Sequence, residues 1–288
     1  MITFYELGSL GRLGNQLFQY AALRALTLHQ GCEAGIPNPD LVGWHGQKCL
    51  LNNFNLEASL LDKPKPAKTF YKETDPFCYD SNFWNVKDGT NISGFFQSTL
   101  YFKGYEKQII KELTPKRELL ELGKEYVNSL REDSSPIVSL HIRLGDSIDG
   151  TNRGAMKMFG EDSSQLDWDS FYGKYIRAAM DKFEGCKFLV FAGGARWTEE
   201  NTTEIEWCKN IFKGDKFLFS NNARTVEDLC RIMACDHHIL SPISSFGWWA
   251  AYLNTRKEKQ VVAPLHYHSD KPEYTHREGF YPKEWILC

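Results

Sequence analysis

The chain has 288 residues, a formal net charge of −3 and 25% charged residues, which is enough length for two globular domains or one large one. Lys and Arg are scattered rather than clustered, so the charge pattern argues against a nucleic-acid partner. No apolar run reaches the length of a membrane span and the N-terminus lacks a secretory signal pattern, so we expect a soluble, cytoplasmic protein.

The eight cysteines include no Cys-x-x-Cys pair, and no other cluster of metal-ligand residues stands out, so we expect no metal. An even number of cysteines would permit disulfides. In a soluble chain of this size, free buried thiols are the better expectation.

The N-terminal segment predicts a strand at 2–7 and an amphipathic helix at 15–29. Between them lie Gly8, Gly11 and Gly14, in a turn that can bind phosphate at the helix N-terminus or can simply pack the helix on the strand. The glycines are three apart, which is not the Gly-x-Gly-x-x-Gly pattern of dinucleotide-binding folds, so an NAD-dependent enzyme is disfavoured.

Two further helices are predicted at 105–113 and 116–131. The polar run at 132–136 follows them and ends in proline, which is typical of an interdomain linker. We therefore expect two domains, at 1–134 and 135–288.

The second half alternates regularly between strands and helices of about 10–15 residues, which predicts a parallel, Rossmann-like sheet. The predicted strands are 137–143, 187–192, 217–219, 237–241 and 260–263, and the predicted helices are 168–184, 199–212, 225–234 and 246–254.

The first of these strands, within Pro-Ile-Val-Ser-Leu-His-Ile-Arg-Leu-Gly-Asp, becomes polar toward its end. The carboxyl ends of parallel strands open onto the ligand crevice, so we expect His141 and Arg143 there, with Asp146 just past the turn. Arg143 could grip a phosphate through its planar guanidinium, or it could form an ion pair with Asp146 that closes the loop. The sequence leaves both interpretations open.

A second polar strand end follows at Ser244 and Ser245, which fit the N-cap of the last predicted helix. Free backbone N–H groups and the helix dipole suit a diphosphate there, although the serines could serve only as caps. Asp228 lies near the start of helix 225–234, where it could favour the dipole or accept two N–H bonds from guanine. Since Arg143 and the serines follow strands of one predicted sheet, one anion could contact both.

Four motifs, in this order and spacing, resemble the family-11 glycosyltransferases, the α-1,2-fucosyltransferases. The resemblance extends from near residue 8 to near residue 285, and the third motif is also similar to one in the wider fucosyltransferase group. The motifs are GRLGNQLFQYA at 11–21, GFFQSTLYF at 94–102, HIRLGD at 141–146 and SSFGWWAAYLN at 244–254.

The resemblance implies an α/β, GT-B-like fold with two Rossmann-type lobes facing across a cleft, the first on the acceptor side and the second binding the nucleotide sugar. It implies inverting transfer of fucose from GDP-fucose, without metal or cofactor, to the 2-hydroxyl of a β-galactoside in a glycan. By the same resemblance, Arg143 would hold the diphosphate, and guanosine would be contacted by His141 and Asp228. The phosphate side would be bound by Ser244, Ser245 and Phe246. The donor or the acceptor would lie beside Gly14 and Asn15.

The general base that such a reaction can use is not fixed by the motifs. Asp146 is the candidate because it belongs to the third motif, but it could instead orient Arg143. Glu6 and Asp149 are rivals.

Two departures from the family pattern leave the donor open. Leu144 stands where the family commonly has a second Arg, and Ala192-Gly193-Gly194 stand where it often has Ser-Asp-Asp. The alternatives are therefore another nucleotide-sugar donor, or a carbohydrate-binding relative without catalytic activity.

Overall fold

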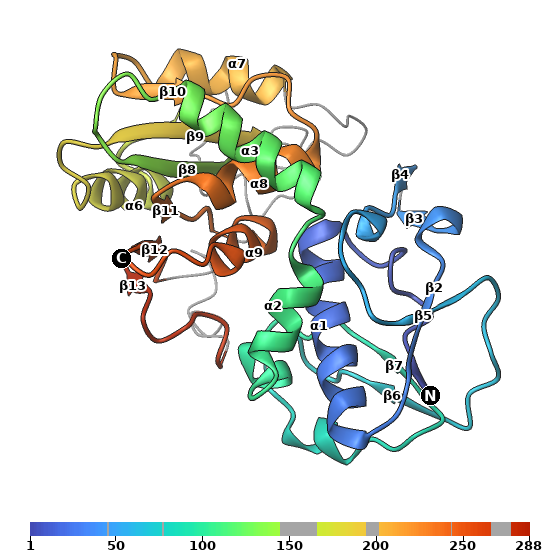
Figure 1. The fold of residues 1–288 in the computed structure, drawn as a ribbon. Coiled ribbons are helices and arrows are strands. Elements are labelled where there is room, and N and C mark those ends of the chain that lie inside the picture. Colours follow the sequence, from blue (N-terminus) through green and yellow to red (C-terminus); the bar gives the residue numbers. More distant parts are fainter. Residues whose placement is uncertain (45, 77, 145–165, 194–201, 243, 266–277) are drawn as a thin grey trace. The chain divides into compact units, whose positions relative to one another are not determined.

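The computed structural model describes the chain except residues 45, 77, 145–165, 194–201, 243 and 266–277. It divides into two compact units (Figure 1). Unit 1 holds Met1–Lys116 with Arg277–Pro282, and unit 2 holds Arg117–His276 with Lys283–Cys288. The sequence predicted the domain boundary at residue 134. The observed boundary lies earlier, at residue 116, so the helix Arg117–Ser129 belongs to unit 2.

The described part of unit 1 contains a five-stranded sheet in the order β5-β2-β1-β7-β6, with every neighbouring pair parallel. The strands are β1 Ile2–Thr3, β2 Ala34–Pro37, β5 Ser59–Leu61, β6 Thr69–Lys72 and β7 Thr90–Ser93. Two further short strands, β3 Gly43–Trp44 and β4 Gln47–Lys48, form a small antiparallel pair. Short 3-10 turns lie at Pro39–Leu41, Leu51–Asn53, Ser81–Asn85 and Thr99–Phe102.

Helix α1, Leu13–Gln30, packs against β1 and β2 and confirms the helix predicted at 15–29. It ends at Gly31, whose φ of 64° lies in the left-handed region that glycine tolerates best. Beside it, α2 spans Glu106–Leu113. The core under these elements is aromatic: Phe96 contacts Phe4, Phe83 and Tyr101 with ring centroids 5.1–5.9 Å apart.

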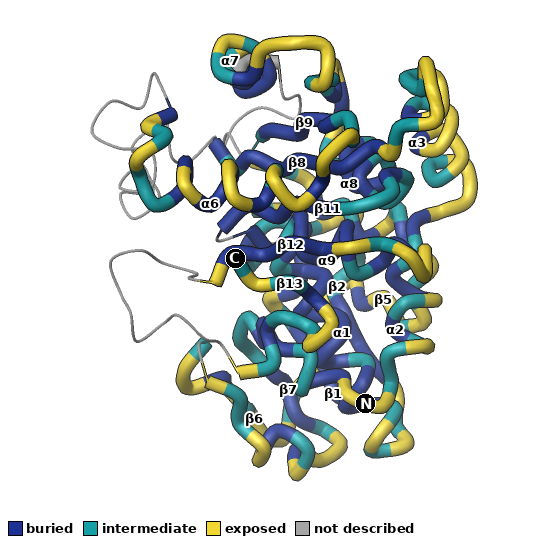
Figure 2. Tube along the Cα trace, turned by 90° about the vertical axis from the view of Figure 1, so that its left-hand side faces the viewer, coloured by how far each residue is buried: buried dark blue, intermediate teal, exposed yellow. Residues whose placement is uncertain are grey.

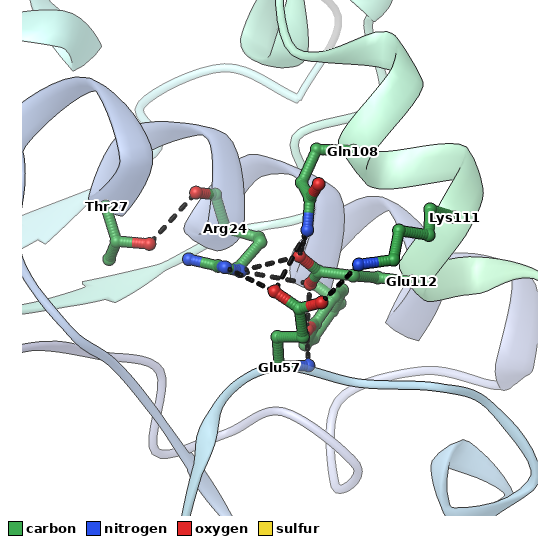
Figure 3. A network of polar contacts seen from close by, with 7 residues as sticks. Arg24, Thr27, Glu57, Gln108, Lys111 and Glu112 are labelled. Atoms are coloured by element: carbon green, nitrogen blue, oxygen red, sulfur yellow. Dashed lines mark hydrogen bonds and ion pairs between the residues drawn. The ribbon is translucent and has the colours of Figure 1, made fainter.

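A buried polar network joins α1 to α2 and to the segment after the second 3-10 turn (Figure 3). The Tyr20 hydroxyl donates to Glu112 at 2.5 Å and accepts from the backbone N–H of Glu57 at 2.9 Å. Arg24 pairs with the fully buried Glu112 at 2.9 Å. Burial, with the hydrogen bond to Glu112, raises the pKa of Tyr20, so the phenol stays a donor at any ordinary pH.

The described part of unit 2 contains a six-stranded parallel sheet in the order β10-β9-β8-β11-β12-β13. The chain builds outward from β8 through β9 to β10 and then returns to place β11 on the other side of β8. The topological switch point therefore lies between β8 and β11. The strands are β8 Ile137–Arg143, β9 Lys187–Gly193, β10 Phe217–Phe219, β11 His237–Ile239, β12 Val261–Ala263 and β13 Ile286–Leu287.

Five described helices surround this sheet. Its inner strands β8, β9 and β12 are largely buried, whereas the outer faces of α3 and α6 are exposed (Figure 2). α3 packs along α8, with Gly123 so close to Cys230 that an added Cβ would lie 2.7 Å from the Cys230 backbone. This contact explains why α3 belongs to unit 2. The helices are α3 Arg117–Ser129, α6 Phe171–Met180, α7 Thr202–Ile211, α8 Thr225–Ala234 and α9 Ser245–Leu253.

Two parallel α/β units confirm the expected fold class. The eight cysteines, all described, are free thiols as expected, but only four of them are buried: Cys49, Cys208, Cys230 and Cys235. Within the described residues, no helix has the length and apolar character to cross a bilayer.

Candidate functional site

The ends of β8 and β11 meet at the switch point of unit 2. The backbone N–H of Arg143, the last residue of β8, donates to Ser241 Oγ at 3.0 Å, and Ser241 follows β11. The Tyr172 hydroxyl of α6 lies 3.0 Å from the same Oγ, so the serine links both strand ends to a helix. Arg143 is only partly buried, and as the last residue of β8 it lies at the carboxyl edge of the sheet.

His141, two residues earlier on β8, is 7% exposed, and among the described residues its Nδ1 has no hydrogen-bond partner. Burial, together with the charge of Arg143, lowers the pKa of His141 to about 3, so the ring is neutral at physiological pH. A buried ring nitrogen without a partner is uncommon in folded proteins and fits a position that a ligand completes.

The N-terminus of α9 packs against this histidine. Ser244 Oγ accepts the backbone N–H of Gly247 at 3.3 Å, which confirms Ser244 as the N-cap. The Phe246 ring centroid lies 5.7 Å from that of His141, and a Cβ on Gly247 would lie 2.7 Å from His141 Nδ1. The first turn carries no acidic side chain, so the positive end of the helix dipole is available to an anion.

Asp228 lies in the first turn of α8, as expected, and is 7% exposed. Its Oδ1 accepts the Ser220 hydroxyl at 2.6 Å, and Ser220 Oγ in turn accepts from Arg231 at 2.8 Å. Ser220 directly follows β10, so the carboxylate is held at the same edge of the sheet as Arg143. Its contact with guanosine stays a prediction.

The structure thus brings His141 against the first turn of α9, which holds Ser244, Ser245 and Phe246. Arg143 lies two residues after His141, at the end of the same strand. Asp146 and Asp149 lie outside the described residues, so their proposed roles stay predictions. Leu144 is fully buried and offers no second cation, while Ala192 and Gly193 end β9 and Gly194 lies outside the described residues.

Gly14 and Asn15 lie in unit 1, in the first turn of α1. Gln97 Nε2 donates to Asn15 Oδ1 at 2.6 Å. Gln16 Nε2 donates to the carbonyl oxygens of Gly8 and Gly11, which both have positive φ, so the amide holds the glycine turn in shape.

Sequence reasoning missed three residues that build the unit 2 edge: Ser241, Tyr172 and Gly247. Gly247 had a usable signal, because a glycine inside a helix is costly unless another group approaches closely. The roles of Ser241 and Tyr172 depend on which strands are neighbours, and the local sequence does not encode that.

Comparison with known proteins agrees with the motifs. The profile of glycosyl transferase family 11 matches residues 2–288. An Escherichia coli α-1,2-colitosyltransferase is 27% identical over 287 residues, covering 88% of this chain and 89% of that protein. The Homo sapiens galactoside α-(1,2)-fucosyltransferase 1 is 28% identical and covers 84% of this chain, but this chain spans only 63% of its length.

Solved fucosyltransferases share the fold. POFUT1 in complex with GDP-fucose superposes with a TM-score of 0.51 at 12% identity, covering 91% of this chain and 97% of that chain. NodZ from Bradyrhizobium gives 0.50 at 11% identity, covering 86% and 91%. These likenesses support the GT-B-like fold, and the profile match over nearly the whole sequence shows that the chain belongs to glycosyl transferase family 11 and is a glycosyltransferase.

Proposed function

We propose that this enzyme transfers fucose from GDP-fucose to a hydroxyl of a glycan acceptor, the 2-hydroxyl of a β-galactoside, with inversion and without a metal ion. The observation that carries the proposal is the packing of the capped N-terminus of α9 against His141, two residues before Arg143 at the carboxyl end of β8. The name of the Homo sapiens relative and the four motifs support the choice of fucose and of a galactoside acceptor.

In this proposal the GDP diphosphate binds between the Arg143 guanidinium and the N-terminus of α9. Charge-assisted hydrogen bonds of this kind are stronger than neutral ones. Neutral His141 contacts the nucleoside side through its unpaired Nδ1, and Asp228, held by Ser220, accepts N–H groups of guanine.

Transfer breaks the bond between fucose C1 and the phosphate oxygen, and the electron pair leaves with GDP. Arg143 and the positive end of α9 stabilise that added charge, which is the task a metal ion performs in other transferases. The acceptor hydroxyl attacks C1 from the face opposite GDP, which inverts the configuration, and its proton passes to a base.

A second donor is worth testing because the Escherichia coli relative is named as a colitosyltransferase and matches along most of both chains. Ala192 and Gly193, the described part of the Ala192-Gly193-Gly194 departure, end β9 at the carboxyl edge that carries Arg143. The second candidate is therefore transfer of a colitosyl group by the same residues.

The test has two stages. Thermal-shift measurements with GDP, UDP and ADP should show stabilisation by GDP, and stabilisation by UDP alone would refute the nucleotide assignment. Radiolabelled transfer from fucosyl and colitosyl donors to a glycan array, with linkage analysis, then identifies the sugar and the bond. Undiminished turnover in a chelator is expected, whereas loss of turnover that added Mg²⁺ or Mn²⁺ restores would contradict metal independence.

A further inference from the structure

Three buried polar side chains of unit 2, which we call the polar triad, join two strands of the sheet to the end of α9. His238 on β11 is fully buried, while Ser139 on β8 and Asn254, directly after α9, are 1% and 3% exposed. The ring nitrogen Nδ1 of His238 lies 2.8 Å from Ser139 Oγ, and Nε2 lies 2.8 Å from Asn254 Nδ2. The polar triad therefore connects β8 to the C-terminal end of α9 through β11.

Backbone partners fix which groups donate and which accept in the polar triad. Asn254 Oδ1 accepts the backbone N–H of Arg256 at 2.9 Å, and its Nδ2 donates to the Cys235 carbonyl oxygen at 2.9 Å, so the amide has one orientation. Since Nδ2 also donates to His238 Nε2, the ring carries its proton on Nδ1, which donates to Ser139 Oγ. Burial lowers the pKa of His238 well below its ordinary value, so the ring stays neutral and keeps this tautomer.

The polar triad lies on the face of the sheet where α9 meets His141. Ser139 and His141 are two residues apart on β8, so their side chains point to the same face. The first turn of α9 contacts His141 through Phe246 and Gly247. The other end of α9 is tied to Ser139 by the polar triad, across the register pair of Ser139 with His238. The helix is thus held on this face at both ends.

The polar triad does more than cap the last turn of α9. Lys259 Nζ donates to the carbonyl oxygens of Ala251 and Asn254, so this turn already has a donor for its carbonyl groups. Apolar side chains could fill the same space, but their contacts would tolerate sliding of the helix. Hydrogen bonds hold their heavy atoms within about 2.7–3.2 Å, whereas a slip of one residue moves a helix by about 1.5 Å. The polar triad therefore specifies where α9 lies along β8.

We propose that His238 is a positioning residue for nucleotide binding, which fixes α9 along β8 and so holds the N-terminus of α9 where the diphosphate of the donor binds. The inference depends on the proposed function, because that function assigns the diphosphate to the N-terminus of α9. His238 contacts neither substrate in this role. It acts through Ser139 and Asn254, which attach the two sides of its ring to the strand and to the helix.

The test measures the Kd for GDP by calorimetry in His238→Leu and His238→Gln, with urea unfolding of each variant. Leu has a similar volume but accepts no hydrogen bond, so α9 loses its tie to β11. GDP affinity should then fall by about tenfold, the effect of weakening one hydrogen bond to a charged group. The Gln carbonyl oxygen can accept from Asn254 Nδ2, so His238→Gln should recover most of that affinity.

Two milder variants separate the position of α9 from a general loss of stability, and they decide the test if His238→Leu does not fold. Ser139→Ala removes only the hydrogen bond between β8 and the ring, and should weaken GDP binding by about 2- to 10-fold. Ile205→Val is the matched control, because it removes one buried methylene from α7, which packs against β9. It should lower the urea midpoint by a similar amount and keep the wild-type Kd for GDP.

Three results would overturn the inference while leaving the proposed function intact. The first is wild-type GDP affinity in folded His238→Leu, or in Ser139→Ala if the former does not fold. The second is an affinity as weak in His238→Gln as in His238→Leu. The third is an equal loss in Ser139→Ala and Ile205→Val, because the effect would then follow stability alone. If the wild type itself binds no GDP, the proposed function fails and the inference falls with it.

Discussion

Substituting Gly247 by Ala tests whether the α9 N-terminus must lie against His141. The added Cβ would be 2.7 Å from His141 Nδ1, so one group must move by about 0.7 Å to reach an ordinary contact of 3.4 Å. His141 is on a strand paired on both sides and is 7% exposed, so the tip of α9 is the part that shifts. A shift of that size stretches a 2.9 Å hydrogen bond beyond hydrogen-bond range.

We therefore expect the variant to lose one charge-assisted contact with the diphosphate, about 1.5–3 kcal/mol, which weakens GDP binding by about 10- to 100-fold. Ala favours a helix over Gly by up to about 1 kcal/mol, which offsets part of an overpacking cost of about 1–3 kcal/mol, so the fold should persist.

Calorimetric titration with GDP measures the affinity, and urea unfolding measures stability. A double-mutant cycle with His141→Ala supplies the control: once the ring is gone, Gly247→Ala should add little further loss. GDP binding at wild-type affinity in the single variant, or an equal loss in the His141→Ala background, would refute this packing argument.

Two further predictions concern stability. Tyr20→Phe leaves Glu112 and the Glu57 N–H without their shared hydroxyl and should cost about 1–3 kcal/mol in urea unfolding. Tyr105→Phe removes a hydroxyl that contacts the exposed His29 ring and should cost under about 0.5 kcal/mol; equal losses for the two variants would contradict the role of the network. Lys259 donates to the Ala251 carbonyl oxygen near the α9 C-terminus, and burial lowers its pKa from 10.5 to about 8. The unfolded chain therefore binds the proton more tightly than the native state between those values, so the unfolding free energy should rise with pH from about 8 to 10. The Lys259→Met variant should lack that rise. If the unfolding free energies of the variant and the wild type changed in parallel with pH, the prediction would be wrong.

The local elements were the part most accessible to sequence reasoning. The helix at 225–234 has the predicted bounds, and α1 differs from its prediction by two residues at the start and one at the end. Strand β8 has the predicted bounds because its alternation and the break at Gly145 are both local signals.

The domain boundary and some of the site residues could not be predicted, because they depend on contacts between segments that are distant in the sequence. The polar run at 132–136 looked like a domain boundary, yet α3 before it packs on α8, more than 90 residues later in the sequence. Likewise, Ser241 contributes to the site only because β11 pairs with β8. Strand order decides these neighbours, and no single stretch of residues specifies it.

The central claim is that Arg143 and the α9 N-terminus together carry the charge of the departing nucleoside diphosphate. The most direct test is the turnover of Arg143→Ala with GDP-fucose, beside Arg177→Ala, an exposed arginine of the same unit whose guanidinium lies over Trp168. We predict a fall in kcat of about 10²-fold or more for Arg143→Ala with an unchanged unfolding midpoint, and wild-type turnover for Arg177→Ala. Wild-type turnover in a folded Arg143→Ala enzyme would contradict the claim.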